Sequence, residues 1–267
     1  MVREPWPTEE APRSPGSGGP RPAAGAHDAA SAGSTPADSA RLRLYQLVSP
    51  ALPVGAFSYS EGLEVLVQSG RLGDGAAVQA WLEAELQRGA LRLEAAALPS
   101  LTELLRDWQE QVGHDANGAA AARLRLIERD GWLLAQREAA ELRAQQRQMG
   151  GSLLQLLKDL GWPLSEPLPL AWPAAFAWAG HCLAVPGAAL VEAYLYGWVA
   201  NQLSAAVRLV PLGPTEAQRL QLRLAPTIAA QAAELAATDP EMLWNGGVGS
   251  GLAQLGHSAL YSRLFRS

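Results

Sequence analysis

The chain has 267 residues, a formal net charge of −5 and a single cysteine. The length suits one large domain or two small ones, and the negative charge argues against nucleic acid as a partner. A single cysteine excludes an intrachain disulfide and favours a reducing compartment, so we expect a cytoplasmic protein. Alanine and leucine dominate while β-branched residues are scarce, which favours helices over sheets.

The first 38 residues differ in composition from the rest of the chain. They are rich in Pro, Gly, Ala and Ser and have no apolar periodicity, which predicts a disordered extension over residues 1–38. Their acidic start has no apolar core, unlike a secretory signal. The longest uncharged run, residues 167–191, is divided by prolines into pieces too short for a membrane span, so we expect no membrane contact.

Residues 50–64 read PALPVGAFSYSEGLE and combine a proline-stiffened loop with a predicted helix start. Ser58 and Glu61 form an S-x-x-E capping box, which predicts a helix that begins at Tyr59 and ends before Gly70. Aromatic residues in such a loop either contact a partner or fold into the chain's own core, and the sequence leaves both readings open. The candidate partner-binding residues of this stretch are Pro53, Phe57, Tyr59 and Glu61.

Further helices are expected along the chain. Asp74 is a candidate cap for the second helix, and Leu124 and Ile127 are expected in the core. Residues 187–210 are apolar nearly all round, which predicts the central helix of a bundle. The other expected helical stretches are 98–108 with Pro99 in its first turn, 119–160, 174–185, and the segment from the turn after Val210 to about Ala237. The sequence therefore predicts one all-α helical-bundle domain over residues 39–240 and a glycine-rich, flexible tail over 241–267.

The sequence contains no catalytic constellation. The four histidines, His27, His114, His181 and His257, share no helical spacing with one another, so we predict no metal site and interpret His181 as a core histidine. The motif SYSEG lacks the preceding strand of a nucleophile elbow, and GGVGSG lacks the lysine of a phosphate loop. We therefore assign no catalytic, cofactor-binding or metal-binding residue and expect no cofactor.

The tail ends in YSRLFRS, where three apolar residues have the spacing of one short helical face. A lone segment of this length does not hold a helix in water, so we expect it to be mobile until a partner covers it. The alternative is that the aromatic side chains fold back onto the helical body. The candidate partner-binding residues of the tail are Tyr261, Arg263, Leu264 and Phe265.

The stretch LYQLVSPALPVGAFSYSEGLEVLVQSGRL resembles the N-terminal signature of the urease accessory protein F family, UreF. Three later stretches, WLEAEL, AYLYGWVANQLSAAVRLVPLGPTEAQRL and HSALYSRLFRS, resemble further family segments in the same order. The resemblance covers about Leu42 to Ser267. The chain departs from the family at Pro214 and Ala217, where Gln and Gly are more usual.

This resemblance implies an all-α cytoplasmic chaperone that forms a homodimer and is not an enzyme. The implied partners are urease accessory protein D/H, the accessory GTPase G and apo-urease, and the implied role is nickel insertion that depends on GTP hydrolysis. By the same resemblance Arg263 is a GTPase contact. Two alternatives stay open: a generic dimeric helical adaptor, and a helical enzyme with an apolar pocket near Trp172, Trp178 and Trp198.

Overall fold

The computed structural model describes residues 36–267, with side chains from Arg41 onward. Throughout this part of the chain the regular elements are helices and there is no strand, which confirms the predicted all-α class. The first helix, α1 (Pro36–Leu47), starts three residues before the predicted domain boundary at residue 39. Apart from residues 36–38, the predicted disordered extension lies outside the described residues.

The next elements in the chain are η1 (Ala56–Ser58), α2 (Leu63–Gln68), α3 (Gly75–Arg88) and α4 (Leu91–Gln111). Asp74 caps α3 as predicted, because its carboxylate accepts a hydrogen bond from the backbone N–H of Ala77 at 2.9 Å. The prediction for α4 was wrong at its start. This helix already begins at Leu91, so Pro99 lies in its interior instead of its first turn.

The predicted capping box of Ser58 and Glu61 was also wrong. Ser58 ends the short turn η1, and α2 begins only at Leu63. Between them Glu61 (φ 49°) and Gly62 (φ 88°) adopt left-handed conformations, which a helix cannot contain. The side chain of Glu61 therefore points into the protein instead of back to the start of a helix.

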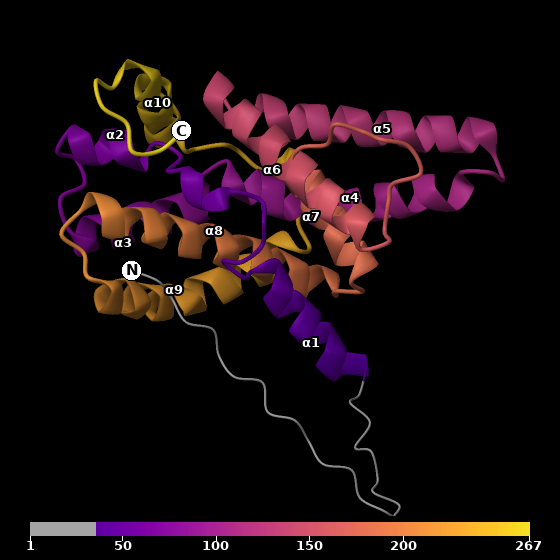
Figure 1. The fold of residues 1–267 in the computed structure, drawn as a ribbon, viewed down its shortest axis with the longest axis horizontal. Helices are drawn as coiled ribbons and strands as arrows, with labels where there is room; N and C mark the ends of the chain where they lie inside the picture. Colours follow the sequence, from indigo (N-terminus) through magenta and orange to yellow (C-terminus); the bar gives the residue numbers. More distant parts are fainter. Residues whose placement is uncertain (1–35) are drawn as a thin grey trace, which may run out of the picture. The chain divides into compact units, whose positions relative to one another are not determined.

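The next three helices are α5 (Ala116–Ala135), α6 (Ala140–Asp159) and α7 (Trp172–Cys182). Helix α4 contacts α5 and α7, and α6 contacts α7 (Figure 1). Leu124 and Ile127 of α5 were predicted to lie in the core, but both are exposed. Helix α5 buries only the face toward α4 and α6, and this face carries Ala119, Ala122, Leu126 and Leu133.

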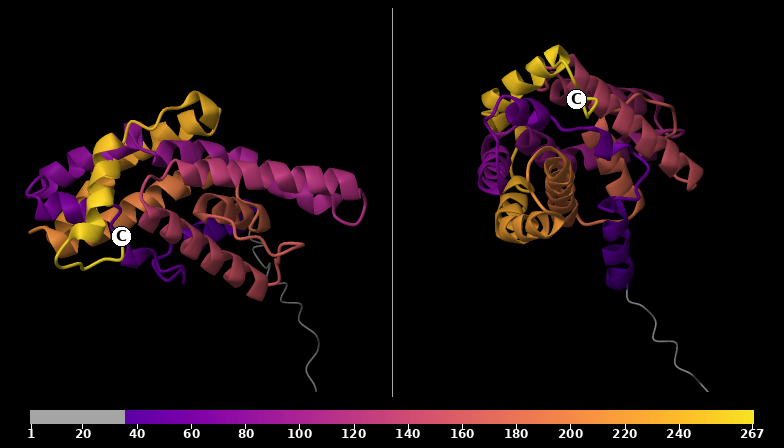
Figure 2. Two further views of the ribbon diagram at one scale, coloured as in Figure 1. Left: turned by 90° about the horizontal axis from the view of Figure 1, so that it is seen from above. Right: turned by 60° about the vertical axis from the view of Figure 1, so that its left-hand side comes forward.

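Helix α8 (Gly187–Leu209) is the central helix that the sequence predicted. It contacts α1, α2, α3, α4, α7 and α9 (Pro214–Leu235), and Leu195 and Val199 on it are fully buried. The views in Figures 1 and 2 show α8 and α9 side by side. Pro214 is the first residue of α9, where its missing N–H removes no intrahelical hydrogen bond.

The C-terminal region contains η2 (Pro240–Met242), α10 (Val248–Gly256) and η3 (His257–Ala259). Helix α10 packs on α2 (Figure 2, yellow on indigo), and the chain then returns to the helical body. The sequence predicted a flexible tail with a helical face at its end. Instead residues 260–267 are non-helical and Phe265 is buried, which is the fold-back alternative.

No helix between residues 36 and 267 combines the length and the apolar character that crossing a bilayer requires.

Candidate functional site

Glu61 lies in the left-handed turn between η1 and α2 and is followed by Gly62. Besides the left-handed backbone, a close contact with α10 favours glycine at position 62. A Cβ atom on Gly62 would lie 3.1 Å from the carbonyl oxygen of Ser250 in α10. Glycine at this position therefore serves both the left-handed backbone and the close approach of α10. The turn directs the Glu61 carboxylate toward the interior, where its side chain is 11% exposed.

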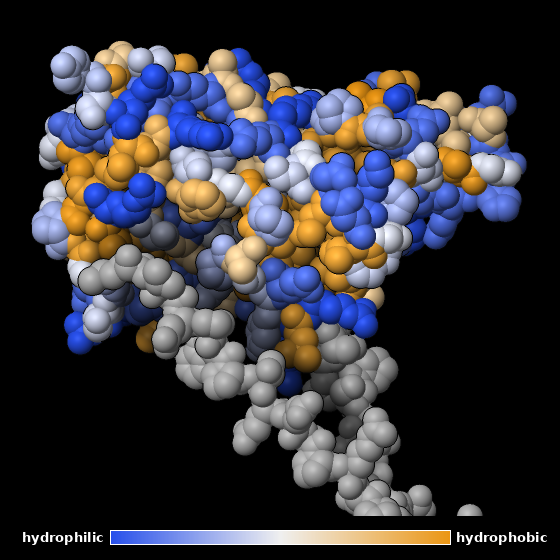
Figure 3. Space-filling model, viewed as in Figure 1, coloured by the Kyte–Doolittle hydropathy of each residue, from blue (hydrophilic) through white to orange (hydrophobic). Residues whose placement is uncertain are grey.

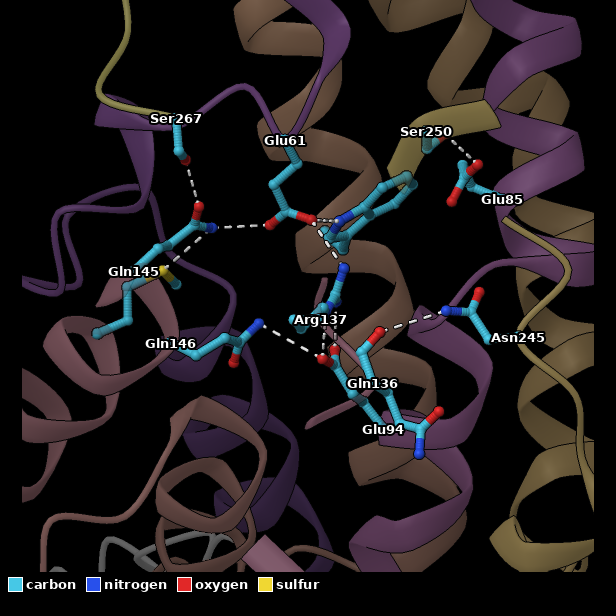
Figure 4. Close-up of polar contacts among 12 residues, drawn as sticks. Glu61, Glu85, Glu94, Gln136, Arg137, Gln145, Gln146, Asn245, Ser250 and Ser267 are labelled. Carbon is cyan, nitrogen blue, oxygen red and sulfur yellow. Dashed lines mark hydrogen bonds and ion pairs between the residues drawn. The ribbon is translucent and has the colours of Figure 1, made fainter. Parts of the chain in front are cut away.

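The Glu61 carboxylate has partners from three other parts of the chain. Its Oε1 accepts a hydrogen bond from Gln145 Nε2 at 2.8 Å, and its Oε2 accepts one from Trp198 Nε1 at 3.0 Å. Arg137 Nη1 lies 3.5 Å from the same Oε2. Figure 4 shows Glu61 between Gln145 and Arg137, with Ser267 of the C-terminal segment bonded to Gln145.

A second carboxylate, Glu94 of α4, binds the other side of Arg137. Arg137 donates hydrogen bonds from Nε and Nη2 to the two Glu94 oxygens, each at 2.7 Å. The Tyr194 hydroxyl donates to Glu94 Oε2 at 2.8 Å. Burial opposes the charge on Arg137, but Glu94 and Glu61 outweigh burial and raise the pKa of the guanidinium. Burial and the charge of Glu94 raise the pKa of Tyr194, so its hydroxyl stays protonated and donates.

These residues form a buried polar group that we call the Glu61 network. Its members are Glu61, Glu94, Arg137, Gln145, Tyr194 and Trp198. The network joins α4, α6, α8, the turn before α2 and the connection between α5 and α6. The sequence analysis chose Glu61 as a partner-binding residue and named Trp198 only as part of a possible apolar pocket. The others lie on separate elements without a shared motif, so no local signal in the sequence could have identified them.

The structure divides the predicted residues of the first stretch into surface and interior. Pro53 and Phe57 are exposed, Phe57 by 69%. Tyr59 is buried, and its hydroxyl donates to Gln148 Oε1 at 2.8 Å. Tyr59 and Glu61 therefore lie in the interior of the helical body. Of the four predicted residues in this stretch, only Pro53 and Phe57 are exposed to a partner.

The predicted residues of the tail divide in the same way. Tyr261 is fully exposed, while Arg263 and Leu264 are about half exposed. Phe265 is buried, and the guanidinium of Arg208 lies 4.5 Å from its ring centroid. The prediction of one shared helical face was wrong, because residues 260–267 are not helical, and Phe265 is buried while Tyr261 and Leu264 are exposed.

The two stretches chosen from the sequence contact each other. The backbone N–H groups of Ser60 and Glu61 donate to the main-chain oxygen of Ser267, at 2.6 and 3.2 Å. Arg266 N–H donates to the carbonyl oxygen of Ser58 at 2.9 Å. The tail is therefore held against the turn that carries Glu61.

Another surface was missed in the sequence analysis. In the segment from η2 to the end of α10 the exposed apolar side chains are Met242, Trp244, Val248, Leu252 and Leu255, and Trp244 is 87% exposed. Val248, Leu252 and Leu255 have i, i+4, i+7 spacing, so helical periodicity could have identified this outward face. We call these five residues, together with the exposed Tyr261 of the same C-terminal region, the C-terminal apolar surface.

A cavity of about 290 Å³ lies between the loop after α1 and helices α6, α7 and α8. Trp172, Trp198 and Phe57 are among its lining residues. On the face of the molecule shown in Figure 3, apolar residues gather in several patches. Glu94 and Arg137 also line the cavity, but they bind each other. Trp178 instead donates its Nε1 to the carbonyl oxygen of Trp162.

The described residues do not assemble a metal or nucleophile site. Among residues 36–267 no three His, Cys, Asp or Glu side chains are close enough to hold a metal ion. Burial raises the pKa of the Cys182 thiol to about 12, so it is a poor nucleophile near neutral pH. The prediction for His181 was wrong: this ring is exposed and stacks on Trp178, whereas His257 is fully buried.

The described residues form an all-helical body, and its buried charged side chains bind one another. Apolar side chains are exposed on its outer helices, which is typical of a protein that binds other proteins through its surface. The UreF family profile matches residues 72–225, and the chain belongs to this family. It is 40% identical over 232 residues to the urease accessory protein UreF of Alkalilimnicola ehrlichii, covering 85% of this chain and 96% of that protein.

Two cyanobacterial relatives support the same assignment. The proteins of Synechocystis and of Prochlorococcus marinus strain MIT 9215 are both called urease accessory protein UreF, at 39% and 36% identity. They match 86% and 85% of this chain, and 98% of their own length in both cases. The relatives are accessory proteins, and the chain is accordingly an accessory protein and not an enzyme.

Proposed function

We propose that this chain is a homodimeric chaperone of urease maturation in the cytoplasm. It assembles with urease accessory protein D/H and the accessory GTPase G, docks on apo-urease and supports GTP-dependent insertion of nickel. Family membership and the names of the relatives support the link to urease. The structural observation that carries the proposal is the pair of separate apolar surfaces, one around α10 and one around Phe57.

The C-terminal apolar surface supports a partner-binding role because its large side chains are exposed close together in the chain. Trp and Tyr are enriched among the residues that contribute most to protein interfaces, and here Trp244 and Tyr261 both point to solvent. We assign this surface to accessory protein D/H. Arg263 follows Tyr261 by two residues and has a side chain that is 44% exposed, and it is the proposed contact to the GTPase.

The surface around Phe57 supports the homodimer. Phe57 is exposed next to the cavity between the loop and α8, and Tyr196 on α8 is also exposed. A twofold interface pairs a surface with a copy of itself, so it needs a projection and a recess on the same patch. Phe57 provides the projection and the cavity provides the recess.

Reconstituted activation of apo-urease tests the proposal. Purified apo-urease, accessory protein D/H, GTPase G, nickel, bicarbonate and GTP are combined with the wild-type chain or with Leu252→Asp. We expect urease activity only with the complete set, and at least a tenfold lower yield with Leu252→Asp. The matched control is Leu222→Asp, a leucine on α9 that is 74% exposed compared with 64% for Leu252, and we expect it to change the yield by less than twofold.

Three outcomes would contradict the proposed function or a part of it. If omission of the wild-type chain does not reduce urease activation, the chain has no role in maturation. If the chain binds both accessory proteins but does not increase activation, it is a generic adaptor. Equal losses with Leu252→Asp and Leu222→Asp would remove the assignment of D/H to the C-terminal apolar surface.

A further inference from the structure

The cavity between the loop after α1 and helices α6, α7 and α8 has an apolar entrance and a polar floor. Phe57 and Tyr196 are exposed at the entrance, whereas Glu94, Arg137 and Gln146 are buried at the floor. The volume of about 290 Å³ is at the lower end of the range for small-molecule sites. The cavity therefore has the size and the polarity gradient for a small ligand with one polar end.

Gln146 of α6 brings an unpaired hydrogen-bond acceptor to this floor. The residue is 3% exposed, and its Nε2 faces Glu94 Oε1 at 3.5 Å (Figure 4). Its Oε1 has no hydrogen-bond donor within the described part of the chain. Turning the amide over would point an oxygen at the Glu94 carboxylate, so the charge of Glu94 keeps the acceptor unpaired. A ligand with N–H groups would satisfy this buried oxygen.

The charged residues of the floor leave one negative charge without a counter-charge. Among the described residues that line the cavity, the charged ones are Glu61, Glu94 and Arg137, so two carboxylates face one guanidinium and the formal sum is −1. Arg137 already contacts both carboxylates, at 2.7 Å from Glu94 and 3.5 Å from Glu61. A water molecule would satisfy Gln146 Oε1 but would leave this charge, whereas a cation with N–H groups compensates both.

The walls above the floor suit the remainder of such a ligand. Trp172, Phe176 and Tyr194 form a row of aromatic contacts, with ring centroids 5.3 Å apart in both pairs. Leu52 and Met149 line the same cavity. Aromatic faces attract cations, and apolar side chains favour the burial of a short hydrocarbon chain.

We propose that this cavity binds a small organic cation, a guanidinium or primary ammonium group on a short apolar chain. The cationic group donates to Gln146 Oε1 and offsets the excess charge of Glu61 and Glu94, while the chain lies against the aromatic wall. A metal ion is a poorer fit, because the described lining residues include no His or Cys and both carboxylates already contact Arg137.

Binding by the isolated chain does not depend on the proposed role in urease maturation. The proposed homodimer uses the apolar entrance at Phe57. A phenylalanine ring from a second copy neither donates a hydrogen bond to Gln146 nor carries a charge, so the floor of the cavity needs an occupant of its own.

Isothermal titration calorimetry of the full chain with a matched pair of probes tests the proposal. n-Butylguanidinium and n-butylurea have nearly the same shape, but only the first carries a charge. At constant ionic strength we expect one site per chain and at least tenfold tighter binding of n-butylguanidinium, because a charged donor forms the stronger hydrogen bonds. The proposal is wrong if the wild-type chain binds neither probe or binds both equally.

Two near-isosteric substitutions separate the acceptor from the charge. Gln146→Met removes the acceptor and should weaken binding of n-butylguanidinium at least tenfold. Gln155→Met changes an exposed glutamine of the same helix and should leave the affinity unchanged. Glu61→Gln brings the formal sum at the floor to zero and should reduce the preference for n-butylguanidinium over n-butylurea to less than about threefold. Loss of packing alone would weaken both probes and leave that preference unchanged, which would overturn the proposal, as would equal effects of Gln146→Met and Gln155→Met.

A free small cation and the arginine side chain of a partner protein offer the same chemistry. Nα-acetylarginine amide carries the guanidinium on a peptide backbone and therefore distinguishes the two sources. An affinity equal to that of n-butylguanidinium assigns the site to a basic side chain, and at least tenfold weaker binding, about 1.4 kcal/mol, assigns it to a free cation.

The buried positions of Gln146 and Glu61 require a further variant that is expected to fold. Ala200 of α8 lines the cavity and is partly exposed. Ala200→Leu adds apolar volume without changing any charge, so it should abolish binding of n-butylguanidinium by filling the cavity. Binding that persists in folded Ala200→Leu would place the ligand elsewhere on the molecule and would overturn the proposal.

Discussion

Arg137 and Glu94 form a two-point ion pair inside the helical body, with both N–O distances at 2.7 Å. Arg137 comes from the connection between α5 and α6, and Glu94 comes from α4. Tyr194 of α8 and Glu61 of the turn before α2 complete the surroundings of the pair. The charges therefore fix how several elements are positioned around α8.

Removal of one member of this pair should be strongly destabilising. Arg137→Met leaves Glu94 and Glu61 buried without their cation, and we expect a loss of about 3–5 kcal/mol in the free energy of unfolding. Urea denaturation measures this loss. The control Arg106→Met removes a half-exposed arginine of α4 and should cost less than about 1 kcal/mol. A loss below about 1 kcal/mol for Arg137→Met would show that the Glu61 network does not support the fold.

Glu85 should make the protein less stable as pH rises. Burial raises its pKa, while the Ser250 hydroxyl bond and the charge of Arg137 act in the opposite direction. Because the folded chain holds this proton more tightly, the stabilising contribution is present below the ordinary glutamate pKa. It is lost as pH rises through the raised value. We expect Glu85→Gln to increase the melting temperature more at pH 7 than at pH 4.

Exposed Glu103 on α4 provides the comparison for Glu85. Glu103→Gln should show no greater gain at pH 7 than at pH 4. An equal effect of Glu85→Gln at both pH values would contradict the role of burial.

The two aromatic residues of the tail should separate folding from binding. Phe265 is buried and Tyr261 is fully exposed. We expect Phe265→Ala to cost about 3 kcal/mol in unfolding free energy, because it empties a buried site, and Tyr261→Ala to cost less than about 0.5 kcal/mol. Tyr261→Ala should instead weaken recovery of accessory protein D/H in a pull-down. Comparable stability losses for the two variants would contradict the docked tail.

Phe57 should matter for self-association and not for folding. Its side chain is 69% exposed, so Phe57→Ser should change the unfolding free energy by less than about 0.5 kcal/mol. We expect the dimer dissociation constant, measured by analytical ultracentrifugation, to rise at least tenfold, which corresponds to about 1.4 kcal/mol. Leu222→Ser on α9 changes another exposed residue and is the control, and it should leave the dimer dissociation constant unchanged. A wild-type chain that stays monomeric at all concentrations would refute the proposed homodimer.

Features that depend on near neighbours in the chain could be predicted from the sequence. The all-α class, the Asp74 cap and the central position of α8 follow from residue composition, a local hydrogen bond and apolar character on every side of one helix. The stretches 44–72 and 193–220 also carried enough local information to indicate the family. For these features the deciding interactions lie within a few turns of helix.

The interior of the site depended on the tertiary structure. Ser58 and Glu61 match a capping box, yet the approach of α10 to Gly62 and the charge of Arg137 favour a left-handed turn with Glu61 inside. Likewise, the spacing within YSRLFRS did not reveal that Glu64 binds the backbone of Leu264 and Phe265. Each of these outcomes joins residues far apart in the chain. Buried charges and N–H groups need partners, and only the packing of separate helices determines which partners are within reach.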